Sequence, residues 1–531
     1  MINGRIVFSA ASAAVCLASC AAFGAPAPDE LCIGDLTGRT VKPLNGVGAG
    51  PKTGWGLGRD GGVYIDATPL YRKIAPPFVR LHDIETPFAR GQFFDMHVYM
   101  DDKTPGHARY FEKSDAYIDS ILAAVPWAKI IFRLGESIGI ADGMNPYAVK
   151  PSDYDAWCRA AVEVAEHYAR KYPKTEWYFE IWNEANLTGP ADDHSNHKTF
   201  SSAPHSGDTC PSADYFRLYE KAALALGALR EKGGYRNVKI GGPAESGIEK
   251  GGWSTFSCEE FLAELERYNA EHGCVVPLDF YSWHQYDGSA VVKPVADKVG
   301  RLLKATKNYT RTLNICDEWN LTCDPKRVPQ ISAAEGAANT LATMIAWQDS
   351  ALDAAVYYDV QLCGAFNGLW YKPYLDVMVG SEDMHREFRA AFQTNGCEGI
   401  TALQKRIFAP TADKPIVTLG GYWAMRAFTA LAGYGEILGI ERGSAVPDTV
   451  YALAARSESG GALAVVNNSG KPVKLRITAV PLPIPVTMTR VTGGTEPFAP
   501  AKSSVSKMDV SSGSVELALA PYEIVLMDTD E

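Results

Sequence analysis

Short apolar segments alternate with longer amphipathic segments from the N-terminal region to about residue 434. The short segments are rich in β-branched and aromatic residues and end in Gly or polar residues, as buried strands do. Eight of them are candidate strands: 46–50, 78–82, 129–135, 176–184, 238–242, 278–284, 312–318 and 354–360. Because helical patterns separate the candidate strands, the sequence predicts a parallel sheet built from βα units.

The clearest helical pattern spans residues 151–172. Its apolar residues recur at the spacing of one helix face: Trp157, Ala160, Ala161, Val164, Ala165 and Tyr168. Further helices are expected at 115–124, 213–232, 255–272, 291–307, 332–350 and 419–432. Eight βα units predict a (β/α)₈ barrel, whose functional residues lie at the C-terminal strand ends. A doubly wound open sheet is the alternative, but no G-x-G-x-x-G sequence follows the first strand.

After about residue 434 the helical periodicity disappears, and short alternating strands are separated by Gly, Ser and Pro. This pattern predicts an antiparallel β-sandwich over residues 435–531. We interpret it as a structural domain packed on the barrel; a sugar-binding module is the alternative.

The N-terminal residues 1–27 resemble an export signal, with Arg5 followed by an apolar run too short to cross a bilayer. The sequence LASC, which ends at Cys20, resembles the lipobox of bacterial lipoproteins; simple cleavage within 21–27 is the alternative. We therefore expect an exported bacterial protein that is periplasmic, outer-membrane-anchored or extracellular. No later segment is apolar enough to span a membrane, and the barrel is expected to occupy residues 28–434.

The chain of 531 residues carries a net charge of −11. Without a basic patch, nucleic acid and anionic membranes are not expected partners. Nine cysteines remain beyond the signal, and the absence of a C-x-x-C pair argues against a zinc site. Two connections, 187–212 and 363–419, are long enough to be functional loops. Cys363 and Cys397 could join the second, whereas Asp192, Asp193, His194 and His197 in the first are interpreted as solvated rather than metal-binding.

Two glutamates end candidate strands that lie on opposite sides of an eight-stranded barrel: Glu184 on the fourth and Glu318 on the seventh. Retaining glycoside hydrolysis requires two carboxyl groups about 5–5.5 Å apart, one as proton donor and one as nucleophile. The position of the two glutamates therefore predicts this reaction but does not assign the two roles. On the fourth strand, Glu180 has the same parity as Glu184, and we expect it to be a buried acid paired with Arg80.

The sequence WNEANL around Glu184 resembles the WNEP-type motif of clan A glycoside hydrolases, and ICDEWN around Glu318 is similar to their seventh-strand motif. Together with VGAG, RLHDI, IGGPA, LDFYSWHQY and GYWAMRAF, they occur in the order of glycoside hydrolase family 39, which includes β-xylosidases and α-L-iduronidase. The resemblance implies that Glu184 is the acid/base and Glu318 the nucleophile. It also implies that Asn183 binds the sugar hydroxyl beside the anomeric carbon, which requires a distorted strand end.

The same resemblance places His82, His284 and Tyr286 around the innermost sugar, with Tyr286 able to hydrogen-bond the nucleophile. The chain departs from the family at RLGE, which contains Glu136, and at YYDVQLCGAFNGLW, which contains Tyr358. Both residues are candidate sugar contacts. Trp319 and Trp370 could stack on a sugar or pack in the core.

We therefore expect an exported, retaining glycoside hydrolase acting on polysaccharide or oligosaccharide fragments by double displacement. The expected enzyme is exo-acting and β-xylosidase-like, or a relative such as an arabinosidase, and needs no metal or organic cofactor. A non-catalytic carbohydrate-binding barrel and a transglycosidase are the alternatives. The sugar, its linkage and the oligomeric state do not follow from the sequence.

Overall fold

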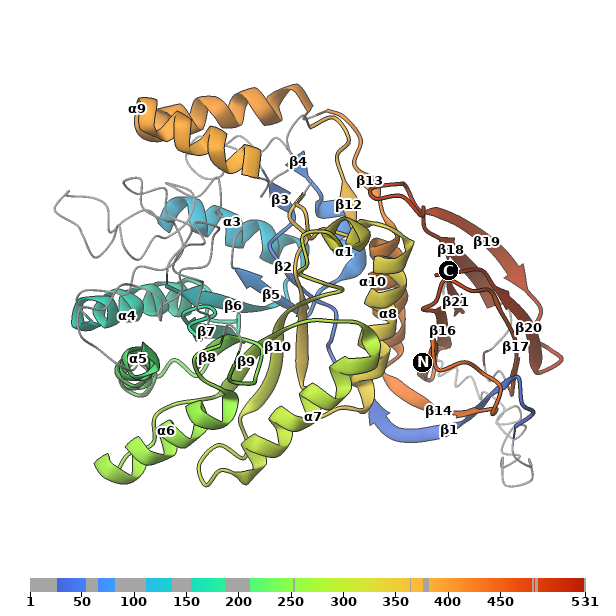
Figure 1. Cartoon of the computed structure of the whole chain (residues 1–531), viewed down its shortest axis with the longest axis horizontal. Coiled ribbons are helices and arrows are strands. Elements are labelled where there is room, and N and C mark those ends of the chain that lie inside the picture. Colours follow the sequence, from blue (N-terminus) through green and yellow to red (C-terminus); the bar gives the residue numbers. More distant parts are fainter. Residues whose placement is uncertain are drawn as a thin grey trace, which may run out of the picture.

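A closed eight-stranded barrel and a nine-stranded β-sheet make up the computed structural model of the chain (Figure 1). The structure describes residues 26–53, 65–81, 111–135, 154–186, 211–251, 254–362, 364–375, 382–411, 413–479, 482 and 486–529. Everything below concerns these residues.

All eight predicted barrel strands are confirmed. They are β2 (Gly46–Gly48), β5 (Phe78–Leu81), β6 (Lys129–Leu134), β7 (Trp177–Ile181), β8 (Val238–Ser246), β9 (Phe280–Tyr286), β10 (Leu313–Asn320) and β11 (Ala354–Tyr357). Each pairs in parallel with its neighbours, and β11 closes the barrel on β2. Their C-terminal ends therefore meet at one face, where the predicted site residues converge.

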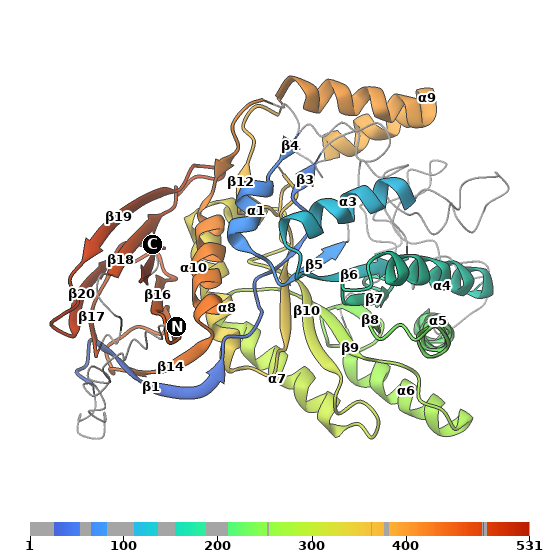
Figure 2. The ribbon, with the colours of Figure 1, turned by 180° about the vertical axis from the view of Figure 1, so that it is seen from behind.

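Helices surround the barrel, and the apolar periodicity predicts most of them (Figure 2 shows the same arrangement from behind). They are α1 (Thr68–Ile74), α3 (Phe111–Ala124), α4 (Tyr154–Lys171), α5 (Pro211–Gly233), α6 (Cys258–His272), α7 (Ser289–Ala305), α8 (Ala334–Ala346), α9 (Glu382–Phe408) and α10 (Gly420–Tyr434). Short 3₁₀ helices lie at Val328–Ser332, Trp347–Asp349 and Ala409–Thr411. The predicted apolar face of α4 is buried along its length. Among these helices, none combines the length and apolar character needed to cross a bilayer.

The barrel interior changes from apolar to charged between the N-terminal and the C-terminal strand ends. Near the N-terminal strand ends it is apolar, with Phe78, Tyr178 and Phe280 in one buried cluster. Two residues further along β5 and β7 stand Arg80 and Glu180, both almost fully buried. Because side chains two residues apart on a strand share a face, these charged groups rest directly on the apolar layer.

The nine-stranded sheet comprises β1 (Glu30–Thr40), β14 (Glu436–Arg442), β15 (Val450–Arg456), β16 (Gly461–Asn467), β17 (Val473–Thr478), β18 (Val486–Thr492), β19 (Lys502–Met508), β20 (Ser514–Leu519) and β21 (Ile524–Asp528). Residues of β16 and β21 share one apolar core with residues of β17 and β20, which lie at the other end of the strand order. The sheet therefore folds over its own core as a sandwich. Two small sheets, β3 (Lys52–Thr53) with β4 (Ile65–Asp66) and β12 (Trp370–Tyr371) with β13 (Val417–Thr418), complete the structure.

Strand β1 belongs to this second sheet, which differs from the predicted barrel span of 28–434. Strand β1 pairs antiparallel with β14 and parallel with β17. Its partners lie about 400 residues later in the sequence, a distance over which local patterns carry no information about pairing.

The sandwich packs on the barrel through strand β16, every residue of which is buried. Ala462, Ala464 and Val466 join the barrel's apolar core, whereas Leu463 and Val465 face the core of the sandwich. Helices α8 and α10 lie between the barrel and the sheet (Figure 1). This two-sided burial agrees with the interpretation of the sandwich as a packed structural domain.

The segment 363–419 was expected to be a long loop, and this prediction is wrong. It contains the 27-residue helix α9 together with strands β12 and β13. The helix was missed because Gly396 and Gly399 interrupt its sequence and its apolar residues follow no regular stripe. The first predicted long loop, 187–212, lies almost wholly outside the described residues. Cys363, one partner of the proposed Cys363–Cys397 disulfide, also lies outside them.

Trp319 and Trp370 are core residues and do not line a sugar site. Trp319 is 1% exposed and packs edge-on against the rings of Trp347 and Tyr357. Trp370 is equally buried, and its indole N–H donates to the carbonyl of Val360 at 3.1 Å. Neither ring presents a face on which a sugar could stack.

Replacing Trp319 tests this placement. We expect Trp319→Ala to lower the free energy of unfolding by about 3–5 kcal/mol, because a buried indole leaves a large cavity. Trp127 is 62% exposed, so Trp127→Ala is the matched control and should change stability by no more than about 0.5 kcal/mol. Chemical denaturation of both variants measures the difference. Parent-like stability of Trp319→Ala combined with weaker sugar binding would restore Trp319 to the sugar site.

Candidate active site

The residues after β7 leave the strand conformation before the two predicted site residues. The strand ends at Ile181, and Trp182 and Glu184 both have positive φ, at 74° and 50°. The Glu184 amide donates to the Ala244 carbonyl on β8 at 2.9 Å, which fixes the turn. The predicted distortion of the strand end is therefore present, as a left-handed turn rather than a bulge. It allows the neighbouring Asn183 and Glu184 side chains to reach the same site.

A bulge in β10 shapes the opposite wall. On its β9 side, Cys316 pairs with Trp283 and Glu318 with His284, so Asp317 is an extra residue in the ladder. Such a bulge breaks the alternation of side chains. Asp317 and Glu318 consequently both lie beside Arg80.

The guanidinium of Arg80 joins three strands of the barrel. It donates to Oε2 of Glu180 from Nε at 2.9 Å and from Nη2 at 2.7 Å. Nη1 donates to Oε2 of Glu318 at 2.9 Å, and Nη2 also reaches Oδ1 of Asn183 at 2.7 Å. The predicted Arg80–Glu180 pair is confirmed, and the same cation also holds two of the proposed site residues.

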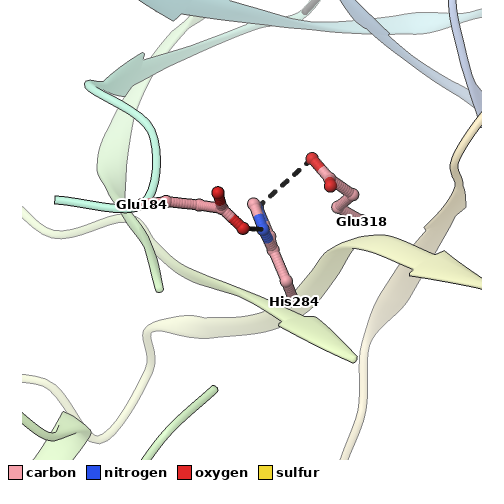
Figure 3. Close-up of side chains that lie close together, drawn as sticks. All are labelled: Glu184, His284 and Glu318. Atoms are coloured by element: carbon pink, nitrogen blue, oxygen red, sulfur yellow. Dashed lines mark hydrogen bonds and ion pairs between the residues drawn. The ribbon is translucent and has the colours of Figure 1, made fainter. Parts of the chain in front are cut away.

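His284 lies between the two glutamates, as Figure 3 shows. Its Nδ1 lies 2.9 Å from Oε1 of Glu184, and its Nε2 lies 3.7 Å from Oε2 of Glu318. One ring nitrogen and one oxygen of each glutamate all lie within 4.8 Å of one another. The carboxyl groups thus face each other across a short gap, with 14% and 8% of their side chains exposed.

Tyr286 completes the surroundings of Glu318. Its hydroxyl donates to Oε1 of Glu318, as the family resemblance implies. Burial raises the pKa of Tyr286 well above its usual value, and the charge of Glu318 adds to the shift. The phenol therefore remains a neutral donor to that carboxylate. Phe366 lies edge-on to Tyr286 and also contacts Tyr358, so an aromatic wall flanks this side.

The two deeper carboxyl groups have pKa values that move in opposite directions. Burial acts to raise the pKa of Glu180, but the charge and hydrogen bonds of Arg80 outweigh it and lower the pKa to about 2. Burial raises the pKa of Asp317 well above its usual range, since the opposing effect of Arg80 is offset by Glu180 and Glu318. The pKa values of two acids around one cation thus move apart.

Glu184, His284 and Glu318 are also the one group of potential metal ligands among the described residues. Arg80 and Tyr286, however, already donate to the two oxygens of Glu318. The arrangement fits an acid–nucleophile pair better than a metal centre.

Of the predicted site residues, the structure brings together Asn183, Glu184, His284, Tyr286 and Glu318. Tyr358 lies beyond them, against the Phe366 ring that also contacts Tyr286. His82 and Glu136 lie outside the described residues, and the loop residues 187–210 do as well. Asp317 was missed because regular alternation places it on the face opposite Glu318. A second acid directly beside Glu318 was the signal available in the sequence.

Comparisons with curated proteins reveal two similar β-xylosidases. The enzyme from Caldicellulosiruptor saccharolyticus is 30% identical over 139 residues, and the enzyme from Geobacillus stearothermophilus is 29% identical over 143 residues. Each alignment covers 26% of this chain and 22% of the relative. The likeness therefore spans less than a quarter of the curated relatives.

Solved structures share the fold over almost the whole chain. A glucosidase from Croceicoccus marinus covers 95% of this chain and 99% of its own, with a TM-score of 0.59 and 16% identity. A structure titled as an arabinofuranosidase covers 94% and 99%, with a TM-score of 0.54 and 13% identity. At these identities the likeness concerns the fold alone.

The family match is more extensive. Residues 93–401 match the family described as Glycosyl hydrolases family 39, and this span is more than half of the chain. It contains both strand-end glutamates, Glu184 and Glu318, and the histidine between them. The chain belongs to glycoside hydrolase family 39.

Proposed function

We propose that this protein is a retaining glycoside hydrolase in which Glu318 is the nucleophile and Glu184 the acid/base. In the first step Glu318 attacks the anomeric carbon while Glu184 protonates the departing oxygen. In the second, Glu184 removes a proton from water, which attacks the glycosyl-enzyme and releases Glu318. Membership in family 39 supports the reaction class.

The separation of the two carboxyl groups carries the choice of mechanism. Retaining enzymes have their carboxyl groups about 5–5.5 Å apart, whereas inverting enzymes leave about 6.5–9.5 Å for a water molecule. The oxygens of Glu184 and Glu318 that face His284 lie within 4.8 Å of one another. This gap favours direct attack by Glu318 over attack by an interposed water.

The contacts of the two glutamates support the assignment of roles. Glu318 receives hydrogen bonds from Arg80 and Tyr286, and such donors stabilise the ionised form that a nucleophile needs. Glu184 lies 2.9 Å from Nδ1 of His284 on the opposite side of the gap, and with Glu318 as the nucleophile it takes the role of acid/base.

The substrate we propose is a β-xyloside or a related pentoside at the end of an oligosaccharide. The two curated β-xylosidases support this sugar as the first to test. Exo action is proposed from the one remaining long connection predicted on the catalytic face, residues 187–212. Aryl xylosides, arabinosides, galactosides, glucosides and fucosides would distinguish the candidate sugars in one screen.

We also propose that the protein is exported. The support is the sequence of residues 1–27, with its short apolar run and the LASC sequence ending at Cys20. Both lie outside the residues that the structure describes.

A mechanism-based fluoroglycoside tests the nucleophile. We expect a 2-deoxy-2-fluoro glycoside of the preferred sugar to add one fluoroglycosyl mass to the protein, located on Glu318 by peptide mass spectrometry. Glu318→Gln should abolish both labelling and turnover, because the amide is a poor nucleophile. Glu271 is exposed on α6, and Glu271→Gln is the matched control that should leave both unchanged. A label on any other residue would contradict the assignment.

The dependence on the leaving group tests the acid. We expect Glu184→Ala to lower kcat by about 10²–10⁴-fold on sugars whose leaving group needs protonation. The rate of the first step should fall much less for aryl glycosides with acidic phenols, since these leaving groups depart without a proton. Steady-state kinetics across a series of aryl glycosides measures how steeply the rate depends on the acidity of the leaving phenol. An equal loss for all leaving groups would exclude Glu184 as the proton donor.

A further inference from the structure

Asp317 lies inside the barrel, where the guanidinium of Arg80 contacts three carboxyl groups. The bulge in β10 turns its side chain toward Arg80, and the carboxyl group is fully buried. Arg80 Nε lies 2.8 Å from Oδ2 of Asp317. The same guanidinium contacts Glu180 at 2.7 Å and Glu318 at 2.9 Å.

Charged and titratable groups face this point from several strands. They are Arg80 on β5, Glu180 on β7, His284 on β9, and Cys316 and Glu318 on β10 itself, with Arg133 on β6 in register with Glu180. If the three acids at Arg80 were all ionised, their charge would exceed that of Arg80 by two. Unbalanced charge in a buried site is costly, and a proton on one acid relieves it.

The hydrogen bonds distinguish Asp317 from the other two acids. Glu318 accepts from Arg80 and Tyr286, and Glu180 accepts two N–H groups of Arg80. Neither oxygen of Asp317 has a hydrogen-bond donor among the described residues, since Nε of Arg80, 2.8 Å from Oδ2, directs its hydrogen at Glu180. Besides Arg80, Glu180 has Ser282 and Asp317 as hydrogen-bond partners. The two carboxyl groups lie within hydrogen-bonding reach of each other. A proton on Asp317 directed at Glu180 satisfies both groups.

We propose that Asp317 is a neutral carboxylic acid that donates its proton to Glu180 and thereby positions Arg80 for Glu318. With Asp317 uncharged, Arg80 neutralises one of the two remaining carboxylates, and the site keeps the single negative charge that a nucleophile requires. Asp317 acts through Arg80 and does not touch the sugar, so it is a positioning residue. Burial and the neighbouring Glu180 raise the pKa of Asp317, in agreement with this geometry.

The proposed protonation state of Asp317 rests on the contacts around Arg80, whereas its effect on turnover rests on the proposed function. The two are therefore measured separately. Infrared spectroscopy detects the C=O stretching band of a protonated carboxyl group apart from the bands of carboxylates. It needs no substrate.

We expect the neutral-pH spectrum of the parent protein to contain a protonated carboxyl band that is absent from Asp317→Asn. Asp287 is exposed after β9, and Asp287→Asn is the matched control that should keep the band. Labelling aspartate with ¹³C in the parent protein should shift this band and leave bands from glutamate in place. That measurement requires no variant to fold. A parent spectrum without an aspartic acid band would overturn the proposal, whatever the protein hydrolyses.

Kinetics then test the positioning role. Asp317→Asn keeps a donor to Glu180 and leaves the charge of the site unchanged. The acid limb of the pH profile of kcat/KM should therefore lie at the same pH as in the parent protein. If Asp317 were an anion, removing its charge would lower that limb by about 1–3 pH units, which would overturn the proposal. Asp317→Ala leaves Glu180 without the donor and should lower kcat by about 10²-fold with a smaller change in KM. Equal activity of the Ala and Asn variants would also contradict a positioning role.

Discussion

The guanidinium of Arg80 is the interaction on which the site depends. Arg80 stands on an apolar layer of the barrel and is 1% exposed, so its charge requires partners within the barrel itself. It finds them in Glu180 and Asn183 from one side and in Asp317 and Glu318 from the other. These partners come from strands that the barrel brings together only when it closes. The closed barrel and the arrangement of the proposed catalytic groups are therefore coupled.

Two departures from regular strand geometry bring the side chains of the site together. The left-handed residues Trp182 and Glu184 let Asn183 and Glu184 reach one site, and the bulge at Asp317 lets Asp317 and Glu318 both lie beside Arg80. Unfavourable backbone conformations of this kind persist where surrounding contacts hold them, commonly at functional sites. Here the amide of Glu184 is held by β8, and the bulged strand is held by Arg80.

The sequence was most informative where periodicity repeats. The eight barrel strands and the apolar face of α4 follow from side-chain alternation and helical spacing. Strand parity, together with the need of a buried acid for a partner, predicted the Arg80–Glu180 pair. It was least informative where a local irregularity or a distant partner decides the structure. Asp317 becomes a site residue only through a bulge, and β1 joins a sheet whose other strands begin about 400 residues later. Trp319 illustrates a third limit, since core and sugar-stacking tryptophans have the same sequence signature.

We propose that Glu318 attacks the sugar directly, because the short gap between the two carboxyl groups favours this attack over attack by an interposed water. The anomeric configuration of the first product tests it most directly. Proton NMR during the first minutes of hydrolysis of the preferred glycoside, before the free sugar mutarotates, reports that configuration. The account predicts a product with the configuration of the substrate. A first product of inverted configuration would show a single displacement by water and would contradict the account.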